Sequence, residues 1–405
     1  MASFLKTNGT QIVHNDRPLW LRGVNLGGWL MMEAYITHAP NYPVLKLERE
    51  FQEAAGKKAL AQFMKSFRDN FIREQDFKNL RQLGFNCIRL PFHYRLIEKS
   101  PYKYDKEGLA YLDKAARWAK EYQIWLILDL HAAPGAQNND WHSDSFGEAN
   151  FWKNKNFLSR VYALWEFLAD RYRNHEWIAG YDLLNETVLN DARPLNKFYK
   201  EVIKTVRSVD KNHILFIEGN RWAQDIECLE DFKDDNYALS VHNYAPLEYV
   251  FNFIPHLKYP LKGVSMKWGK DETRSLFKKH SAIAKQRRRP VFVGEFGVNY
   301  RGGLFGEDHW LWDSLNCFAE FGFHWAYWTY KAVKNNAHPD GIYSYYENPP
   351  WVHREGPLFG WDTYPKLWKS RHAEMIRSWH TENFRENPHV LRLLQGHAQK
   401  NYELK

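Results

Sequence analysis

The sequence is poor in cysteine and has no long apolar run. Its 405 residues include three cysteines, Cys87, Cys228 and Cys317, an odd and widely spaced set that argues against a disulfide framework and lacks the paired spacing of zinc sites. No segment reaches the ~18 apolar residues of a membrane-spanning helix, and residues 1–9 contain no apolar signal-peptide core. We therefore expect buried thiols, no membrane partner, and a chain that is either cytoplasmic or trimmed from a secreted precursor.

Strong charge of one sign is also lacking. Lysine and arginine number 56 against 48 acidic residues, which gives a net charge of +8, and the longest basic run is Arg287-Arg288-Arg289, just before an apolar segment. Such a short run is typical of a solvated loop and not of a nucleic-acid patch. We expect no nucleic-acid partner.

Aromatic residues, in contrast, are abundant. They make up 17% of the chain and include 18 tryptophans, beside a hydrophobic fraction of 44% and a charged fraction of 26% that are typical of a globular protein. This aromatic content exceeds what a core of this size needs. The surplus ring faces suit stacking against flat apolar surfaces such as sugar rings or nucleobases.

Eight short runs rich in β-branched or aromatic residues recur along the chain and predict strands. They are Leu21–Asn25, Asn86–Leu90, Ile124–Leu130, Gly180–Leu184, His213–Glu218, Tyr237–His242, Val291–Glu295 and Phe323–Trp328. Segments between them, such as 107–122 and 196–209, carry apolar residues at helical spacing. Eight alternations of strand and helix predict an α/β fold, the closed (β/α)8 TIM barrel. An open doubly wound sheet is the alternative, but no glycine-rich dinucleotide turn follows the first run.

We expect one domain over residues 1–405, with the barrel at about 18–380 and a helical tail at about 381–405. Asn8-Gly9 and Asn15-Asp16 bracket a short apolar stretch, which predicts a hairpin that caps the bottom of the barrel. The proline-containing stretches 40–43, 254–260 and 335–357 fall in or after strand-to-helix connections, where a barrel places its active-site loops.

The predicted strand ends are unusually polar, and in such a barrel they converge on one mouth. The polar or aromatic ends are Arg89 in the second strand, His131 after the third, Asn185-Glu186 after the fourth, His242-Asn243-Tyr244 in the sixth, Glu295 in the seventh and Tyr327-Trp328 in the eighth. One arginine or histidine at a strand end is usually structural or solvated. Six polar strand ends together indicate a site.

Two carboxylates, Glu186 and Glu295, would face each other across this narrow barrel. A separation of ~5–5.5 Å suits double-displacement hydrolysis of a glycoside. Glu295 would attack the anomeric carbon, and Glu186 would protonate the leaving oxygen and later deprotonate water. We expect the charge of Glu295 to favour the protonated form of Glu186.

Four further residues complete this prediction. Arg89 and Tyr244 can hold Glu295 ionised. Asn185 precedes the acid/base and is placed to hydrogen-bond the sugar 2-hydroxyl, while Trp328 offers a floor for the sugar ring.

The strand-end motifs resemble those of glycoside hydrolase family 5. They are Arg89 in Ile-Arg-Leu-Pro, His131 in Asp-Leu-His, Asn185-Glu186, His242-Asn-Tyr244, Glu295 in Val-Gly-Glu-Phe and Trp328 in Tyr-Trp-Thr, and the match runs from about residue 20 to about 330. The resemblance implies the same roles for the residues discussed above. It adds His131 as a substrate-binding residue and His242 as a supporting catalytic residue.

Three segments, 26–33, 74–80 and 131–138, look most like the exo-β-1,3-glucanase branch of that family. This resemblance implies that Glu33 and Asn138 hydrogen-bond the terminal glucosyl unit. The chain departs from the branch at Ala132, where glycine is common, and at Thr187, where proline is common. These departures bear on linkage specificity and not on the chemistry.

Tryptophans in the strand-to-helix loops are candidates for further sugar subsites, because an indole face can stack on a pyranose. These are Trp141, Trp222 and Trp351. The segment 329–365 around Trp351 has no counterpart in the resemblance, and we expect it to shape the aglycone side of the cleft.

The sequence thus predicts retaining hydrolysis of β-glucans, β-gluco-oligosaccharides or β-glucosides by a monomer without a cofactor. An endo-β-1,4-glucanase or a transglycosylase of the same fold stays open, as does an inactive carbohydrate-binding barrel, although the latter has no need of both glutamates. A metal hydrolase could use His131, His142 and His242, but no His-Glu-x-x-His or paired-cysteine motif supports it.

Overall fold

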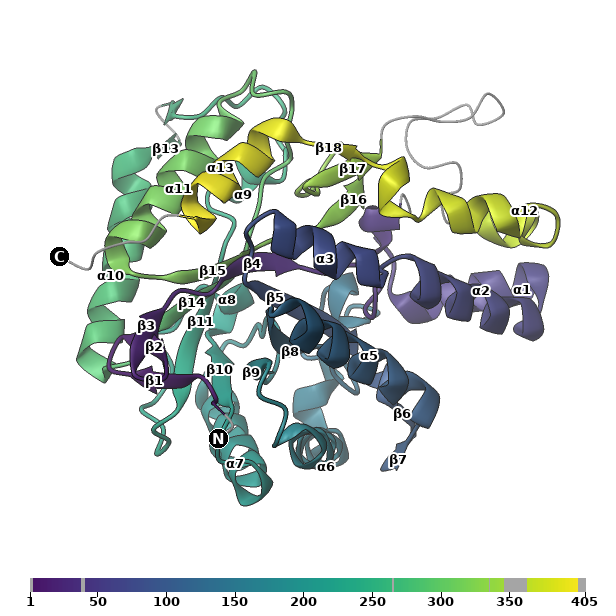
Figure 1. Cartoon of the computed structure of the whole chain (residues 1–405), viewed down its shortest axis with the longest axis horizontal. Coiled ribbons are helices and arrows are strands. Elements are labelled where there is room, and N and C mark those ends of the chain that lie inside the picture. The colour runs from purple at the N-terminus through teal and green to yellow at the C-terminus, as the bar shows by residue number, and fades with distance from the viewer. Residues whose placement is uncertain (1–2, 38–40, 264–265, 335, 346–362, 400–405) are drawn as a thin grey trace.

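The computed structural model describes residues 3–37, 41–263, 266–334, 336–345 and 363–399 (Figure 1). Eight strands form a closed parallel barrel in which the last strand pairs with the first. In order around the barrel, they are β4 (Arg22–Asn25), β5 (Cys87–His93), β8 (Trp125–Ala132), β9 (Ile178–Asp182), β10 (Ile214–Glu218), β11 (Tyr237–Asn243), β14 (Val291–Phe296) and β15 (His324–Tyr327). The predicted barrel is therefore confirmed.

The end of the fourth strand was predicted wrongly. β9 ends at Asp182 and not at Leu184, so Glu186 lies in the connection beyond the strand. The backbone amide of Glu186 donates to the carboxylate of Glu218 and not to a neighbouring strand. Backbone hydrogen bonds from the Leu183 amide to the Phe216 carbonyl and from the Asn185 amide to the Leu130 carbonyl still join this connection to both neighbouring strands.

Long helices in the described part of the chain surround the barrel (Figure 1). They are α3 (Glu74–Gln82), α5 (Lys106–Tyr122), α6 (Lys155–Tyr172), α7 (Arg193–Val209), α10 (Lys270–Arg287) and α11 (Glu307–Phe321). The two predicted helices correspond to α5 and α7. In α5 the residues at helical spacing, Leu109, Leu112, Ala116 and Ala119, are buried as expected.

The N-terminal segment forms a three-stranded antiparallel sheet, β1 (Lys6–Asn8), β2 (Gln11–His14) and β3 (Arg17–Leu19). The predicted hairpin is therefore present, with a third strand added. Ile12 packs with Cys87 and Trp125 at the starts of barrel strands, and Thr7 hydrogen-bonds Asn236, just before β11. The sheet thus closes the bottom of the barrel, opposite the predicted site.

Three helices that the sequence analysis did not predict lie together at one side of the barrel (Figure 1). α1 (Val44–Ala55) and α2 (Lys57–Asn70) are inserted between β4 and α3, and α12 (Tyr364–Ser378) packs against both. The ring of Phe63 in α2 packs against three rings in or next to α12. Its centroid lies 5.0 to 5.5 Å from the ring centroids of Tyr364, Trp368 and Trp379. Much of the aromatic surplus is used here for packing.

The remaining elements are short or terminal. α4 (Tyr94–Ile97), α8 (Asn220–Ala223) and α9 (Leu247–Val250) lie in connections, as do the 3-10 helices η1 (Ala34–Thr37), η2 (Trp141–Ser143), η3 (Asn150–Lys153) and η4 (Thr381–Asn383). Small sheets join β6 (Glu98–Ser100) to β7 (Lys103–Tyr104), β12 (Leu261–Lys262) to β13 (Lys267–Trp268), and β16 (Lys331–Val333) to β17 (Tyr343–Tyr345) and β18 (Arg385–Glu386). The last helix, α13 (Pro388–Ala398), packs on α11.

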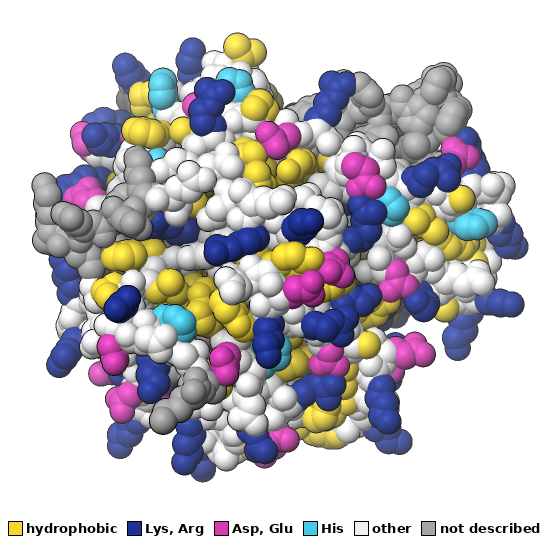
Figure 2. Space-filling view, viewed as in Figure 1, with side chains coloured by type: hydrophobic (Ala, Val, Ile, Leu, Met, Phe, Trp, Pro, Cys, Tyr) yellow, Lys and Arg dark blue, Asp and Glu magenta, His cyan; other side chains and the backbone are white. Residues whose placement is uncertain are grey.

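Basic and acidic side chains are interspersed over the face shown in Figure 2. Within the predicted basic run, Arg287 donates to the backbone carbonyls of Ile226 and Leu229, and Arg289 donates to that of Asp234. Two of its three guanidinium groups thus bind the chain's own backbone. No helix among the described residues is both long and apolar enough to span a bilayer.

Candidate active site

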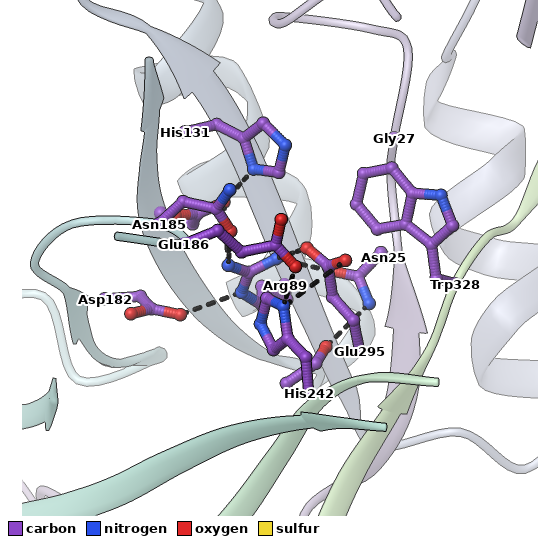
Figure 3. A network of polar contacts seen from close by, with 12 residues as sticks. Asn25, Gly27, Arg89, His131, Asp182, Asn185, Glu186, His242, Glu295 and Trp328 are labelled. Carbon is purple, nitrogen blue, oxygen red and sulfur yellow. Dashed lines mark hydrogen bonds and ion pairs between the residues drawn. The ribbon is translucent and has the colours of Figure 1, made fainter. Parts of the chain in front are cut away.

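The polar residues predicted at the strand ends meet in one buried network at the carboxyl end of the barrel (Figure 3). Arg89 comes from β5, His131 from β8, His242 from β11 and Glu295 from β14, while Asn185, Glu186, Tyr244 and Trp328 lie just beyond their strands. Figure 3 shows Glu186 and Glu295 facing each other, with His242 beside them and Trp328 across from the pair.

Glu295 is surrounded by positive charge and hydrogen-bond donors. Arg89 Nη1 donates to its Oε1 at 2.7 Å, and the Tyr244 hydroxyl donates to its Oε2 at 2.8 Å. Burial opposes ionisation, but the charges of His242 and Arg89 outweigh burial and lower the pKa of Glu295 to about 2. Burial also raises the pKa of Tyr244 well above its usual range, so this phenol stays a donor. Glu295 is therefore an ionised carboxylate at neutral pH.

Glu186 has a different environment. His242 Nδ1 lies 2.6 Å from its Oε1, and His142 Nδ1 lies 3.5 Å from its Oε2. Its backbone has a φ of 40°, a left-handed conformation that a residue with a β-carbon rarely adopts. The Glu218 carboxylate holds its N–H at 2.6 Å, and Asn138 Nδ2 holds its carbonyl at 2.7 Å.

The two glutamates are close enough to act on one glycosidic bond. A carboxylate oxygen of Glu186, one of Glu295 and a ring nitrogen of His242 all lie within 4.8 Å of one another. Retaining glycosidases separate their carboxyl groups by ~5–5.5 Å, whereas inverting enzymes need ~6.5–9.5 Å to admit a water molecule. The separation suits direct attack by a carboxylate.

Arg89 is the centre of the network, and sequence reasoning missed most of its partners. Besides Glu295, it contacts three buried carboxylates at 2.8 to 3.1 Å and donates to two asparagine side chains. The carboxylates are Asp129, Asp182 and Glu218, and the asparagines are Asn25 and Asn185. Asn25 and Glu218 end predicted strands, a signal that could have found them, whereas Asp182 lay inside the predicted run 180–184.

Asn185 is oriented by Arg89, whose Nη2 donates to its Oδ1 at 2.8 Å. Its Nδ2 is buried and has no hydrogen-bond partner among the residues that the structure describes. A buried donor without a partner costs free energy, which a bound hydroxyl group would recover. This geometry fits the predicted contact with a sugar hydroxyl.

His131 and Glu33 form a charged pair beside the two glutamates. His131 Nε2 lies 3.0 Å from Glu33 Oε1, and its Nδ1 lies 2.7 Å from Asp129 Oδ2. Burial favours the neutral ring, but the charges of Asp129 and Glu33 raise the pKa of His131 to about 10. Glu33, predicted only from the family resemblance, is thus held in the site by an imidazolium.

Trp328 lies flat against His131, with ring centroids 5.5 Å apart and planes at 11°. Its Nε1 donates to the hydroxyl of Tyr35 at 2.5 Å. The indole ring of Trp328 can lie close to the backbone at residue 27 because that residue is glycine; a β-carbon there would lie 2.9 Å from the ring. Both edges of the indole are therefore fixed, as a sugar platform requires.

The three remaining candidates among the described residues lie around this centre. Asn138 is buried behind Glu186, and its Oδ1 accepts from the Asp140 backbone. Trp141 packs edge-on against Tyr35. Trp222 is 42% exposed and is tied to the site by a hydrogen bond from its Nε1 to Asp140 Oδ2 at 2.7 Å. Their contacts with substrate stay predictions, and Trp351 lies outside the described residues.

The candidate histidine trio for a metal does not assemble in the described part of the chain. The groups with ligand atoms close enough to share an ion there are Glu186, His242 and Glu295, and Asp129, Asp182 and Glu218. The Arg89 guanidinium already contacts every carboxylate of the second group. In the first group, burial favours a neutral His242, but the charges of Glu295 and Glu218 raise its pKa well above the usual range, so a proton occupies the imidazole.

Comparisons with known proteins agree with this geometry. A family model described as cellulase (glycosyl hydrolase family 5) matches residues 52–334. A β-xylosidase of Phanerodontia chrysosporium is 35% identical over 347 residues, which cover 82% of this chain and 71% of that protein. Endoglucanase C of Acetivibrio thermocellus is 28% identical over 344 residues, which cover 77% of this chain and 91% of that protein.

A solved structure described as a glycoside hydrolase has the same fold, with a TM-score of 0.64 and 19% identity over 94% of this chain and 99% of the other. The family model spans most of the barrel, and the β-xylosidase is similar over most of both chains. The chain therefore belongs to glycoside hydrolase family 5.

Proposed function

We propose that the protein hydrolyses β-glycosidic bonds with retention of anomeric configuration, through a covalent glycosyl-enzyme intermediate. The observation that carries this proposal is the pair Glu186 and Glu295, with carboxylate oxygens within 4.8 Å and with Glu295 ionised by His242 and Arg89. A carboxylate nucleophile beside a proton donor is what double displacement needs.

In the first step Glu295 attacks the anomeric carbon, and Glu186 gives a proton to the leaving oxygen. His242 Nδ1 lies 2.6 Å from Oε1 of Glu186, so the proton is carried by Oε2, which has only the more distant His142 Nδ1 at 3.5 Å beside it among the described residues. In the second step Glu186 takes a proton from water, and the water oxygen displaces Glu295. Oxygen returns to the face from which the leaving group departed, so the configuration is retained.

The substrate class that we propose is a β-glucan, a β-gluco-oligosaccharide or a β-glucoside. The motifs shared with exo-β-1,3-glucanases support a β-1,3 linkage, and the similarity to Endoglucanase C supports the alternative of an endo-acting glucanase. A β-xyloside is the second candidate, because the relative with 35% identity is a β-xylosidase. Xylose lacks the C6 hydroxymethyl group of glucose, so the two classes can be separated directly.

The test is a time course with β-1,3-, β-1,4- and β-1,6-linked gluco-oligosaccharides, β-1,4-xylo-oligosaccharides, a mannan, and the aryl β-glucoside and β-xyloside. Proton NMR follows the anomers that form first. We expect β-anomers, with one linkage and one sugar clearly preferred. An α-anomer as the first product would rule out double displacement, and no turnover of any substrate would favour the inactive carbohydrate-binding alternative.

A further inference from the structure

Glu218 is a fully buried carboxylate at the end of β10 that joins the two halves of the site. Its Oε1 accepts from Arg89 Nη2 at 3.0 Å and lies 3.2 Å from His242 Nε2. Its Oε2 accepts from the backbone N–H of Glu186 at 2.6 Å. Arg89 and His242 in turn bind Glu295 at 2.7 Å and Glu186 at 2.6 Å. One side chain thus contacts the supports of both glutamates.

The contact with the Glu186 backbone is the most direct. A φ of 40° is unfavourable for a residue with a β-carbon, so this conformation has to be held by its surroundings. Glu218 binds the N–H and Asn138 binds the carbonyl. Without the carboxylate of Glu218, the peptide can relax and turn the Glu186 side chain away from the leaving oxygen.

The second contact is electrostatic. Burial alone favours a neutral imidazole, but the charges of Glu295 and Glu218 raise the pKa of His242 well above its usual range. An imidazolium donates a strong, charge-assisted hydrogen bond to Oε1 of Glu186. Glu218 therefore helps to keep His242 in the form that fixes the orientation of the acid/base.

Asp182 offers a matched comparison within the same cluster. It is fully buried and accepts from Arg89 Nε at 2.8 Å, but no hydrogen bond or ion pair joins it to Glu186 or His242 among the described residues. Burial and the charge of Glu218 raise the pKa of Asp182 to about 7. Asp182 and Glu218 share Arg89 as a partner and differ in their contact with the acid/base.

We propose that Glu218 is a positioning residue that aligns Glu186 for proton transfer, through the backbone amide of Glu186 and through His242. This inference rests on the proposed function of Glu186 as the acid/base. It predicts that loss of Glu218 impairs proton donation to the leaving group more than it impairs attack by Glu295.

The test compares Glu218→Gln with Asp182→Asn on aryl β-glycosides of the sugar that the wild-type enzyme cleaves. Leaving groups range from 2,4-dinitrophenol, which departs without protonation, to phenol, which needs a proton. In Glu218→Gln an amide N–H₂ has to face Arg89 and His242 or the Glu186 amide, so at least one contact becomes donor against donor. Rates are expressed per folded enzyme, with the folded fraction taken from thermal unfolding.

For Glu218→Gln we expect kcat/KM on the phenyl glycoside to fall roughly 10- to 100-fold relative to the dinitrophenyl glycoside, a part of the ~10²–10⁴ that a general acid contributes. The basic limb of its pH profile should move to lower pH, because one of the two charges that raise the pKa of His242 is gone. Asp182→Asn should leave the leaving-group ratio unchanged, and its basic limb should move less, because Asp182 acts on His242 only through its charge.

An equal loss on both leaving groups, or the same ratio change in Asp182→Asn, would overturn the assignment and leave Glu218 a structural residue. If Glu218→Gln does not fold, Glu218→Asp keeps the charge and withdraws it by one methylene, and the same ratio decides. Failure of the proposed function looks different, because the wild-type enzyme itself would then cleave none of the glycosides.

Discussion

Replacing Arg89 with glutamine removes the one guanidinium that contacts Asp129, Asp182, Glu218 and Glu295. Breaking a buried ion pair costs ~3–5 kcal/mol, because it leaves an uncompensated charge. At about 2 °C per kcal/mol for a large domain, the Tm should fall by roughly 6–10 °C at neutral pH. The carboxyl groups limit the loss by taking up protons.

That proton uptake gives the variant a characteristic pH dependence. Without Arg89, burial raises the pKa of these carboxyl groups above the value of ~4 that they have in the unfolded chain. A group whose pKa is raised on folding stabilises the protein below its unfolded pKa and loses that contribution as pH rises through the folded pKa. The Tm deficit of Arg89→Gln should therefore widen from pH 5 to pH 8.

Differential scanning calorimetry of the wild type and the variant at pH 5, 6, 7 and 8 measures this deficit. Arg160→Gln is the control, because Arg160 is also buried but pairs with a single carboxylate, Glu98, at 2.7 Å. We expect its deficit to depend less on pH. A Tm within about 2 °C of the wild type at pH 7, or a deficit that narrows as pH rises, would refute the reasoning.

Three further outcomes can be checked. Glu295→Ala and Glu186→Ala should each lose most turnover. Added azide should give an α-glycosyl azide with Glu295→Ala and a β-glycosyl azide with Glu186→Ala, which NMR of the products distinguishes. The same anomer from both variants would contradict the roles of nucleophile and acid/base. Trp328→Ala should raise KM about tenfold with the fold intact. Trp222→Ala should raise KM more for long substrates than for aryl glycosides. Unchanged kinetics of either variant on every substrate would show that the replaced residue is not part of a sugar subsite. Because the pKa of Asp182 is raised to about 7, the Asp182 carboxyl group destabilises the fold increasingly from pH 4 to pH 7. In urea unfolding, the free energy of unfolding of Asp182→Asn should therefore rise relative to that of the wild type over this range. A difference between the two that does not change with pH would argue against the raised pKa.

The barrel could be predicted because its signal is local and repeated. Each strand is a short apolar run, and each of the eight predicted runs forms a barrel strand. The helices added at one side of the barrel were not predicted because their packing partners are distant in the sequence. Val44, Leu47 and Phe51 of α1 do recur at helical spacing, but helix α1 packs on α12 as well as on α2, and no local pattern specifies a contact with a helix some 300 residues later.

The candidate site shows the same limit. Residues with a recognisable motif, such as Arg89 and Glu295, could be named in advance. Glu218 stood at the end of a predicted strand but had no motif, and its importance comes from the three groups that converge on it in space. The backbone conformation of Glu186 was equally hidden, because glutamate carries no local signal for a positive φ.

One site gives two chemically identical side chains, Glu186 and Glu295, opposite roles. Among the described residues, the network around the pair contains six carboxyl groups and three cationic side chains, with His142 at its edge, 3.5 Å from Glu186. The carboxyl groups are those of Glu33, Asp129, Asp182, Glu186, Glu218 and Glu295, and the cations are Arg89, His131 and His242. Such an excess of buried negative charge favours protons that stay within the network.

Where those protons reside depends on how many cations, and how many other carboxylates, act on each carboxyl group. The charges of all three cations act to lower the pKa of Glu295 to about 2, against its burial. For Asp182, burial and the charge of Glu218 outweigh the charge of Arg89 and raise its pKa to about 7. The arrangement of charge thus keeps Glu295 ionised while it leaves protons elsewhere in the network. Removing one cation should redistribute those protons. Arg89→Gln is therefore expected to lower both the stability of the fold and the activity, because Arg89 also helps to keep Glu295 ionised.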